Sequence, residues 1–320
     1  MIEIEKYVIS VYVNRSFSLA ASELFISQPA LSAAIGRHEK SLGFEIFDRS
    51  VLPISLTPKG KIYIEYLDEK QKSENEMKRK IRMLSEEGRR EVSVGAYAYS
   101  GYSILAEISK AFSKKRPEVK VRLDMGNIGH LTNLSEKLKR HELDMMLNYD
   151  FDQKEHDVIP ILTERLIIAM RRDLDGADKI KHLALPLEKI INGDVSEDEM
   201  IRDASLFRDI RFLEYSAYSD TRRRMKLILG DYKRANYYVE NARQVDMHNR
   251  LMRVGIGAVM TTDFHLKNKL FDNNNLLFFA IKSPYAKRNL YMITQKGYEL
   301  SSAANTFIET ATELFGNISK

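Results

Sequence analysis

Residues 27–42 carry side chains that could contact DNA bases. Ser27 is placed to cap a helix, and Pro29 fits its first turn, where a missing N–H group is harmless. One helical face then carries Leu31, Ala34, Ile35, His38 and Leu42. The opposite face carries Gln28, Ser32, Ala33, Gly36 and Arg37. That second face is polar or small, as a helix requires if its backbone is to lie deep in a major groove.

Three further elements must position this helix. A short helix from Ser18 to about Phe25 precedes it across a tight turn, with Ala20, Ala21 and Leu24 as its packed face. An amphipathic helix before that one is indicated by Ile4, Tyr7, Val8 and Val11. Residues 47–57 predict a wing with its tip at residues 50–53.

The sequence of this region resembles the winged helix-turn-helix of LysR-type transcriptional regulators. The matching residues are Ser16-Phe17-Ser18, Ala20-Ala21, Leu24, Ser27-Gln28-Pro29-Ala30-Leu31-Ser32, Ile35, Glu39, Leu42-Gly43, Phe47, Arg49 and Leu56-Thr57-Pro58-Lys59-Gly60. The matches fall in the expected order, so the resemblance is more specific than any short motif alone. The alternative is an unrelated pair of packed helices.

The resemblance implies a role for each side chain that faces DNA. Gln28, Ser32 and Arg37 would reach base edges or adjacent phosphates, since glutamine can pair with adenine and arginine with guanine. Phosphates would be held by Ser16, Ser18, Ser27 and Arg49, which fixes register without reading sequence. The expected DNA-binding set is Ser16, Ser18, Ser27, Gln28, Pro29, Ser32, Ala33, Arg37 and Arg49.

This sequence departs from the family pattern at three positions. Ala33 and Gly36 stand where long polar side chains are common, and His38 replaces a core leucine. Fewer base-reading side chains would shift discrimination towards the shape of the DNA. Gly36 fits either close approach to the DNA backbone or a tolerated surface glycine. For His38 a packed imidazole is favoured over a pH sensor.

A long helix is predicted from Pro58-Lys59-Gly60 to about Glu87, ending at Gly88. Its middle, residues 68–76, is very polar, and Met77, Ile81 and Leu84 then form a thin apolar seam. Pairing with a second copy of the chain explains this pattern better than burial in a monomer. A solvated linker helix is the alternative.

From residue 91 onwards, strands alternate with helices, which predicts a parallel sheet with helices on its faces. The expected strands are 91–95, 119–126, 143–149, 210–216, 237–241 and 257–262, and residues 158–173 are expected to cross from the first α/β unit to the second. We expect the later strands 276–283 and 288–295, with a helix at 301–315, to return to the first α/β unit. Residues 175–205 are polar and poorly periodic, as in an insertion.

This layout resembles the family's effector-binding region, with two Rossmann-like subdomains of the type 2 periplasmic-binding-protein kind. Residues 251–260 are similar to the family's glycine-containing segment, although Thr261-Thr262 replace the proline that usually follows. The predicted domains are 1–58 for DNA binding, 59–88 as the linker and dimerisation helix, and 89–320 for the effector, with subdomain I at 89–162 and 266–320 and subdomain II at 163–265.

A small-molecule effector should bind where strands end, between the two subdomains. Ser100 could cap the helix after the first strand, and residues 126–130 could begin another helix, so the bare N–H groups there would favour an anion. The expected effector-binding set is Tyr99, Ser100, Gly101, Ile128, Gly129, Asn148, Ser216, Asn241 and Thr262. Ordinary capping of helices and strand ends is the alternative for each.

Composition limits other functions of the chain. It has 320 residues and no cysteine, which excludes disulfides and thiolate metal sites. Its 50 basic and 45 acidic residues give a net charge of +5, but residues 1–60 hold six of each, so the prediction of DNA binding rests on pattern rather than charge. We expect no metal and no cofactor, since the histidines lack ligand spacing. Without a signal peptide or membrane span, a cytoplasmic protein is expected.

Two functions remain open from sequence alone. The first is a ligand-responsive transcription regulator, a homodimer or homotetramer that binds double-stranded operator DNA. The second is a cytoplasmic small-molecule-binding or enzymatic α/β protein with an N-terminal helical domain. The chain contains no G-x-S-x-G motif, P-loop or paired-carboxylate motif, which argues against an enzyme.

Overall fold

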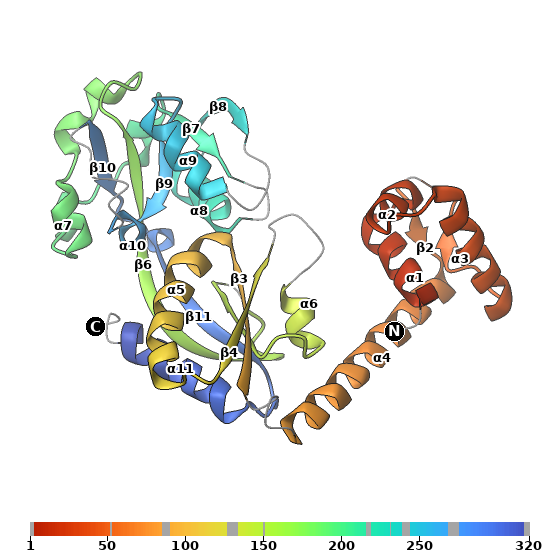
Figure 1. Cartoon of the computed structure of the whole chain (residues 1–320). Coiled ribbons are helices and arrows are strands. Elements are labelled where there is room, and N and C mark those ends of the chain that lie inside the picture. The colour runs from red at the N-terminus through yellow and green to blue at the C-terminus, as the bar shows by residue number, and fades with distance from the viewer. Residues whose placement is uncertain are drawn as a thin grey trace. The chain divides into compact units, whose positions relative to one another are not determined.

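A computed structural model describes most of the chain in two compact units. The described residues are 3–51, 53–84, 90–126, 134–149, 151–215, 219–230, 232–238, 244–267 and 275–316. The first unit spans Met1–Gly88 together with Leu131–Glu142, and the second spans Arg89–His130 and Leu143–Lys320. Figure 1 labels the helices and strands of both units.

The first unit is a winged helix-turn-helix followed by one long helix. Its elements are α1 (Glu3–Asn14), α2 (Phe17–Glu23), α3 (Gln28–Leu42), β1 (Phe47–Asp48), β2 (Ser55–Leu56), α4 (Pro58–Leu84) and, in the later segment, α6 (Leu134–Lys139). Val11, Leu31 and Ile35 are fully buried in a core that the wing residue Phe47 completes. β1 and β2 pair antiparallel, so the helices and the wing lie as the sequence predicts.

Gly60 lets α4 begin against the backbone of the wing. The carbonyl of Ile46 accepts a hydrogen bond from the N–H of Thr57 at 3.0 Å. A Cβ atom at Gly60 would lie 2.0 Å from that same carbonyl oxygen, far inside contact distance. The residue therefore has to be glycine for a steric reason, and its helical conformation needs no positive φ.

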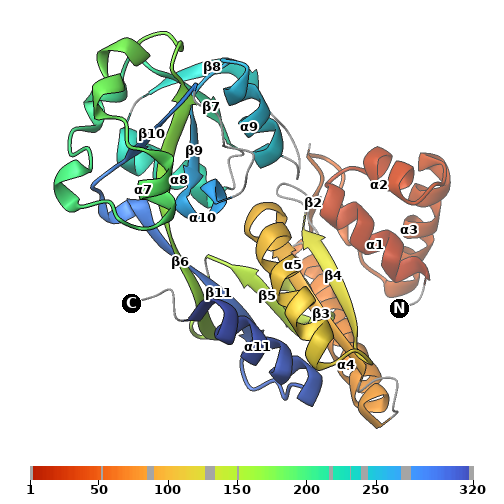
Figure 2. The ribbon, with the colours of Figure 1, turned by 60° about the vertical axis from the view of Figure 1, so that its left-hand side comes forward.

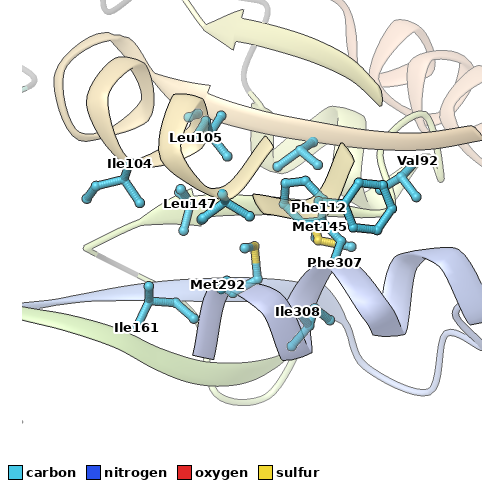
Figure 3. Packing of buried hydrophobic residues seen from close by; sticks show 14 of the residues in the cluster. Val92, Ile104, Leu105, Phe112, Met145, Leu147, Ile161, Met292, Phe307 and Ile308 are labelled. Carbon is cyan, nitrogen blue, oxygen red and sulfur yellow. The ribbon is translucent and has the colours of Figure 1, made fainter. Parts of the chain in front are cut away.

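The second unit contains a first subdomain built on a mixed sheet. Its elements are β3 (Glu91–Tyr97), α5 (Ala98–Lys115), β4 (Lys120–Gly126), β5 (Met145–Asn148), β11 (Lys287–Gln295) and α11 (Ser302–Phe315). β3, β4 and β5 are parallel as predicted, whereas β11 pairs antiparallel with β5. The rings of Phe112 on α5 and Phe307 on α11 lie 5.2 Å apart in the core (Figure 3).

A single long strand, β6 (His156–Arg171), belongs to both subdomains. Its first part, from His156 to Arg165, pairs with β11, and its last part pairs with β9 and β10. Figures 1 and 2 show β6 passing from one subdomain into the other beside β11. The backbone crossing between the subdomains is therefore part of two sheets at once.

The second subdomain surrounds the last part of β6. Its elements are α7 (Leu187–Ile191), β7 (Arg211–Glu214), α8 (Asp220–Leu229), β8 (Lys233–Tyr238), α9 (Gln244–Arg253), β9 (Val259–Thr262), α10 (Asp263–Leu266) and β10 (Leu276–Ala280). β7 and β8 run parallel, and a bridge between Phe212 and Ala258 joins them to the start of β9. β8 begins four residues before the predicted strand.

The expectation for the C-terminal strands is corrected by β10. We expected both late strands to return to the first subdomain, but only β11 does. β10 pairs with Ile167–Arg171 of β6, and the ring of Phe279 lies 5.4 Å from that of Phe207. All five residues of β10 are buried because cores of the second subdomain cover both faces.

The polar segment 175–205 covers the free edge of β10. The N–H of Leu185 donates to the carbonyl of Phe278, and that of Ile201 to Ala280, both at 2.8 Å. Between these anchors the chain forms short turns that bury Ile190. The segment thus belongs to the second subdomain and protects a strand edge from further pairing.

His265 is a buried neutral histidine in the second subdomain. It is 4% exposed, and its Nε2 lies 2.8 Å from the Asn249 amide nitrogen. Burial first, and then the positive charge of Arg288, lowers the pKa of His265 from 6.5 to about 3. The folded state therefore resists taking up a proton that the unfolded state accepts below pH 6.5.

Replacing Gly60 by alanine should destabilise the first unit. The new Cβ cannot avoid the Ile46 carbonyl, so the wing or α4 must move, and thermal melting should occur at a lower temperature. Gly36→Ala is the matched control, because a Cβ there meets nothing within 4 Å. That control should stabilise the protein by about 0.5–1 kcal/mol through helix propensity. Equal melting of the two variants would contradict this account.

The stability of the chain should depend on His265 below pH 6.5. Its contribution is complete above pH 6.5 and is lost as the pH falls through that value towards 3. The free energy of unfolding should then fall by about 1.4 kcal/mol per pH unit more steeply in the parent than in His265→Gln. Denaturant titrations at pH 7 and pH 5 measure this difference, with the exposed His182→Gln as control. Identical pH dependence in parent and His265→Gln would refute it.

Candidate DNA-binding surface and effector region

Capping residues fix where the recognition helix α3 begins and ends. The Ser27 hydroxyl accepts from the N–H of Ala30 at 3.3 Å, and Gly43 ends the helix with φ 76°. Gln28, Ala33 and Arg37 are exposed, while Ser32 and Gly36 are half-buried. The five side chains that the sequence assigned to the major groove are therefore all at least partly exposed on α3.

A buried carboxylate joins α3 to the wing. Glu39 is 6% exposed, and one of its oxygens accepts from the N–H groups of Ile46 at 2.8 Å and Phe47 at 3.1 Å. Its other oxygen accepts from Arg49 at 2.7 Å. Sequence reasoning did not assign this role to Glu39, although it continues the i, i+4 series of Leu31 and Ile35. The bonds fix where the wing begins relative to α3.

Arg49 has structural partners as well as an exposed surface. Its guanidinium lies 5.0 Å from the centroid of the Phe17 ring and pairs with Glu39. The side chain remains 42% exposed. The predicted phosphate contact would therefore come from an arginine that is already held in one orientation.

The serines predicted to hold phosphates lie around helix N-termini. Ser16 caps α2 by accepting from the N–H of Leu19 at 3.3 Å, as Ser27 caps α3. Ser18 is exposed in the first turn of α2. Such N-termini combine free N–H groups with the positive end of the helix dipole, a favourable arrangement for a phosphate.

His38 packs between α3 and α4. Its Nε2 lies 2.7 Å from the hydroxyl of Tyr63, and both side chains are at least partly buried. Burial raises the pKa of Tyr63 above its usual value, as does the charge of Glu5. His38 is therefore a packed imidazole, as the sequence favoured.

The predicted effector region is described only in part. Ile128, Gly129, Ser216 and Asn241 lie outside the described residues. Tyr99, Ser100 and Gly101 lie in the first turn of α5. This helix begins at Ala98, directly after β3, so Ser100 is inside the first turn instead of capping it as predicted. The first-turn N–H groups still lack partners within the helix, because every helix leaves four of them free.

Two other predicted effector residues have structural partners. Thr262 is 2% exposed, and its hydroxyl accepts from the N–H of His265 at 3.1 Å, which caps α10. Asn148 is half-buried at the end of β5, and its side-chain oxygen accepts from the N–H of Tyr149 at 2.9 Å. Thr262 therefore serves as a helix cap, which was the alternative considered for it.

The basic run 222–224 on α8 is paired with acidic residues. Arg222 pairs with Glu214, and Asp220 accepts from Arg223 at 2.6 Å and from Arg224 at 2.8 Å. The side chains of Arg222 and Arg224 are each 18% exposed, so most of their surface is covered by the protein.

Within the part of the chain that the structure describes, no group of three His, Cys, Asp or Glu side chains could hold a metal ion. No described helix is both long enough and apolar enough to cross a membrane.

Two family models cover nearly the whole chain. Residues 6–61 match the bacterial regulatory helix-turn-helix protein of the lysR family. Residues 85–316 match the LysR substrate binding domain. A relative from Bacillus subtilis (strain 168), described as the uncharacterized HTH-type transcriptional regulator YcgK, is 23% identical over 98% of this chain and 94% of its own. A probable RuBisCO transcriptional regulator from Cyanidium caldarium is 25% identical over 97% and 92%.

Solved structures share the fold. Full-length CbnR complexed with its target DNA has a TM-score of 0.55 at 18% identity, covering 97% of this chain and 98% of that one. The effector binding domain of QuiR in complex with shikimate has a TM-score of 0.52 at 16% identity, covering 71% and 97%. The matching families and relatives are transcriptional regulators, so the enzymatic alternative is set aside. The chain belongs to the LysR family of transcriptional regulators, with a helix-turn-helix DNA-binding domain and an effector-binding domain.

Proposed function

We propose that the exposed face of α3 reads operator DNA through Gln28, Ser32 and Arg37. The observation that carries this proposal is the exposure of Gln28 and Arg37 on a helix whose Leu31 and Ile35 are fully buried in the domain core. Ala33 and Gly36 between them leave room for the helix to approach the base edges. Phosphate contacts from Ser16, Ser18, Ser27 and Arg49 then fix the register, with Pro29 shaping the first turn of the helix.

The double variant Gln28→Ala, Arg37→Ala should lose operator discrimination. Each bidentate contact contributes about 1–3 kcal/mol against a wrong base, so specific affinity should fall at least tenfold while non-specific binding changes little. Gel-shift titrations against operator and scrambled DNA measure both affinities. The exposed pair Glu45→Gln, Lys40→Ala is a control outside the proposed face. Unchanged operator affinity in the double variant would refute these residues as base readers.

We also propose that α4 pairs two copies of the chain into a homodimer, or a homotetramer of such dimers. Three apolar side chains near its end support this: Met77 is 52% exposed, Ile81 59% and Leu84 82%. Ile62 and Tyr66 nearer its start are 67% and 53% exposed. A stripe of this kind is typical of a helix that packs against another helix.

Charges placed in this stripe should separate the copies. Ile81→Asp with Leu84→Asp would bury two unpaired carboxylates in the proposed interface, so sedimentation should give a smaller species than the parent chain. Ser73→Asp adds a charge at an exposed position of the same helix and serves as control. If the double variant and the parent sediment alike, the stripe is not the interface.

For the effector we propose a small anion bound between the two subdomains. The first turn of α5, at Tyr99, Ser100 and Gly101, supplies N–H groups without helical partners at the end of β3. Ile128, Gly129, Asn148, Ser216 and Asn241 would complete the site, with Thr262 in a supporting role. The QuiR domain, which shares this fold, is a complex with shikimate, a hydroxylated carboxylic acid.

These roles divide the chain into regions. Residues 1–58 would bind DNA, 59–88 would join copies, and 89–320 would take the effector. Subdomain II would comprise 163–265 together with β10, and subdomain I the remainder of that last region. Because double-stranded DNA is the proposed target, we infer that the protein works in the cytoplasm.

A further inference from the structure

A fully buried arginine lies where the two subdomains are joined. Arg288 on β11 is the register partner of Glu164 on β6. Figure 2 shows these two strands side by side where the subdomains are joined. The side chain of Arg288 is 4% exposed and that of Glu164 is 2% exposed. A charged pair this deep must be satisfied by short, well-directed contacts, because an unpaired buried charge is strongly destabilising.

The guanidinium of Arg288 has partners on every side. Its Nε and one terminal nitrogen both lie 2.6 Å from the same carboxylate oxygen of Glu164. The other terminal nitrogen lies 3.1 Å from Asp220 and 3.1 Å from the hydroxyl of Thr221. The guanidinium carbon lies 3.9 Å from the centroid of the Tyr149 ring, whose hydroxyl donates to Glu164 at 2.7 Å.

These partners come from both subdomains. Tyr149 directly follows β5 in the first subdomain, whereas Asp220 and Thr221 begin α8 in the second. α8 is also tied to the crossing by Arg224, which donates to Asp220 and to the carbonyls of Tyr285 and Lys287, each of these two at 2.9 Å. Arg288 thus contacts Tyr149 of the first subdomain, Asp220 and Thr221 of the second, and Glu164 on the strand that joins them.

Arg288 and Asp220 stay charged despite burial because groups of opposite charge surround them. Burial opposes the charge of Arg288, but Tyr149, Glu164 and Asp220 keep the pKa of its guanidinium above the usual value. Burial would raise the pKa of Asp220, yet Arg288, Arg223 and Arg224 hold it below its usual value. Asp220 is therefore ionised at neutral pH, and the contact with Arg288 is a true ion pair.

We propose that Arg288 is a positioning residue that sets the angle between the two subdomains and so couples the effector region to the rest of the second unit. A planar guanidinium fork can satisfy Glu164, Asp220 and the Tyr149 ring together in only one relative placement of α8 and β5. If the subdomains rotated, Asp220 would move away from the Arg288 guanidinium, whose charge would stay buried beside Glu164.

This proposal rests on the proposed effector function in one respect. An effector can shift the angle only by the difference between its affinities for the two placements, and that difference must exceed the stabilisation from the Asp220 contact. Arg288 itself has no free position for a ligand among these contacts, so its role is distinct from effector binding.

The full-length chain allows a direct test, because it has no cysteine. Lys110→Cys on α5 and Glu188→Cys on α7 place one spin label on an exposed position of each subdomain. Electron resonance then measures the distance distribution between the labels, with labelled chains diluted in unlabelled ones to suppress distances between copies. No DNA or effector is needed, so the outcome is independent of whether the proposed function is correct.

Two variants perturb the cluster and one is a control. Asp220→Asn keeps the shape of the side chain and leaves Arg288 with Glu164, so the chain should still fold. Arg288→Lys keeps the charge but loses the fork. Asp178→Asn removes an exposed carboxylate of the second subdomain, 86% exposed and paired with Lys181.

The parent and Asp178→Asn should give one narrow distribution. Asp220→Asn and Arg288→Lys should each move its mean by more than about 2 Å or add a second population. A parent-like distribution in either cluster variant would overturn the proposal, even if its melting temperature fell, because lost stability alone does not move the labels. An equal change in Asp178→Asn would overturn it as well.

Discussion

The second unit depends on the pairing of Arg288 with Glu164 at the crossing of β11 and β6. These two strands are the structural link between its subdomains, since β6 pairs with β11 in one sheet and with β9 and β10 in the other. A buried ion pair contributes little net stability but strongly penalises arrangements in which one partner is lost. Such a pair at the junction therefore favours a single relative placement of the two subdomains.

In the DNA-binding domain too, a buried charged group fixes two parts of the structure relative to each other. Glu39 accepts from two backbone N–H groups at the start of the wing and from Arg49. The recognition helix, the wing and one cation near the proposed phosphate contacts are therefore fixed relative to one another before DNA arrives. Preorganisation of this kind reduces the ordering needed on binding.

Periodic patterns made most of the fold predictable, and the remainder has identifiable physical causes. The cap at Ser27 and the spacing of Leu31 and Ile35 indicated α3 because packing and capping there agree. β10 was assigned to the wrong subdomain, because a strand buried on both faces does not alternate and so does not show its neighbours. The Arg288 cluster was also missed, since its members, Tyr149, Glu164 and Asp220, are far apart in sequence. Of the site, the exposed face of α3 was predictable, but the capping role of Thr262 needed coordinates.

The proposed role of α3 requires that the chain bind operator DNA sequence-specifically. The most direct measurement is a titration of the full-length protein against DNA flanking its own coding region, repeated at several salt concentrations with competitor DNA present. A sequence-specific regulator should form a complex that survives the competitor, with an affinity that falls steeply as salt rises because phosphate contacts release counterions. Binding that stays weak and equal for flanking and unrelated DNA, at every salt concentration and with candidate anionic effectors added, would refute sequence-specific binding.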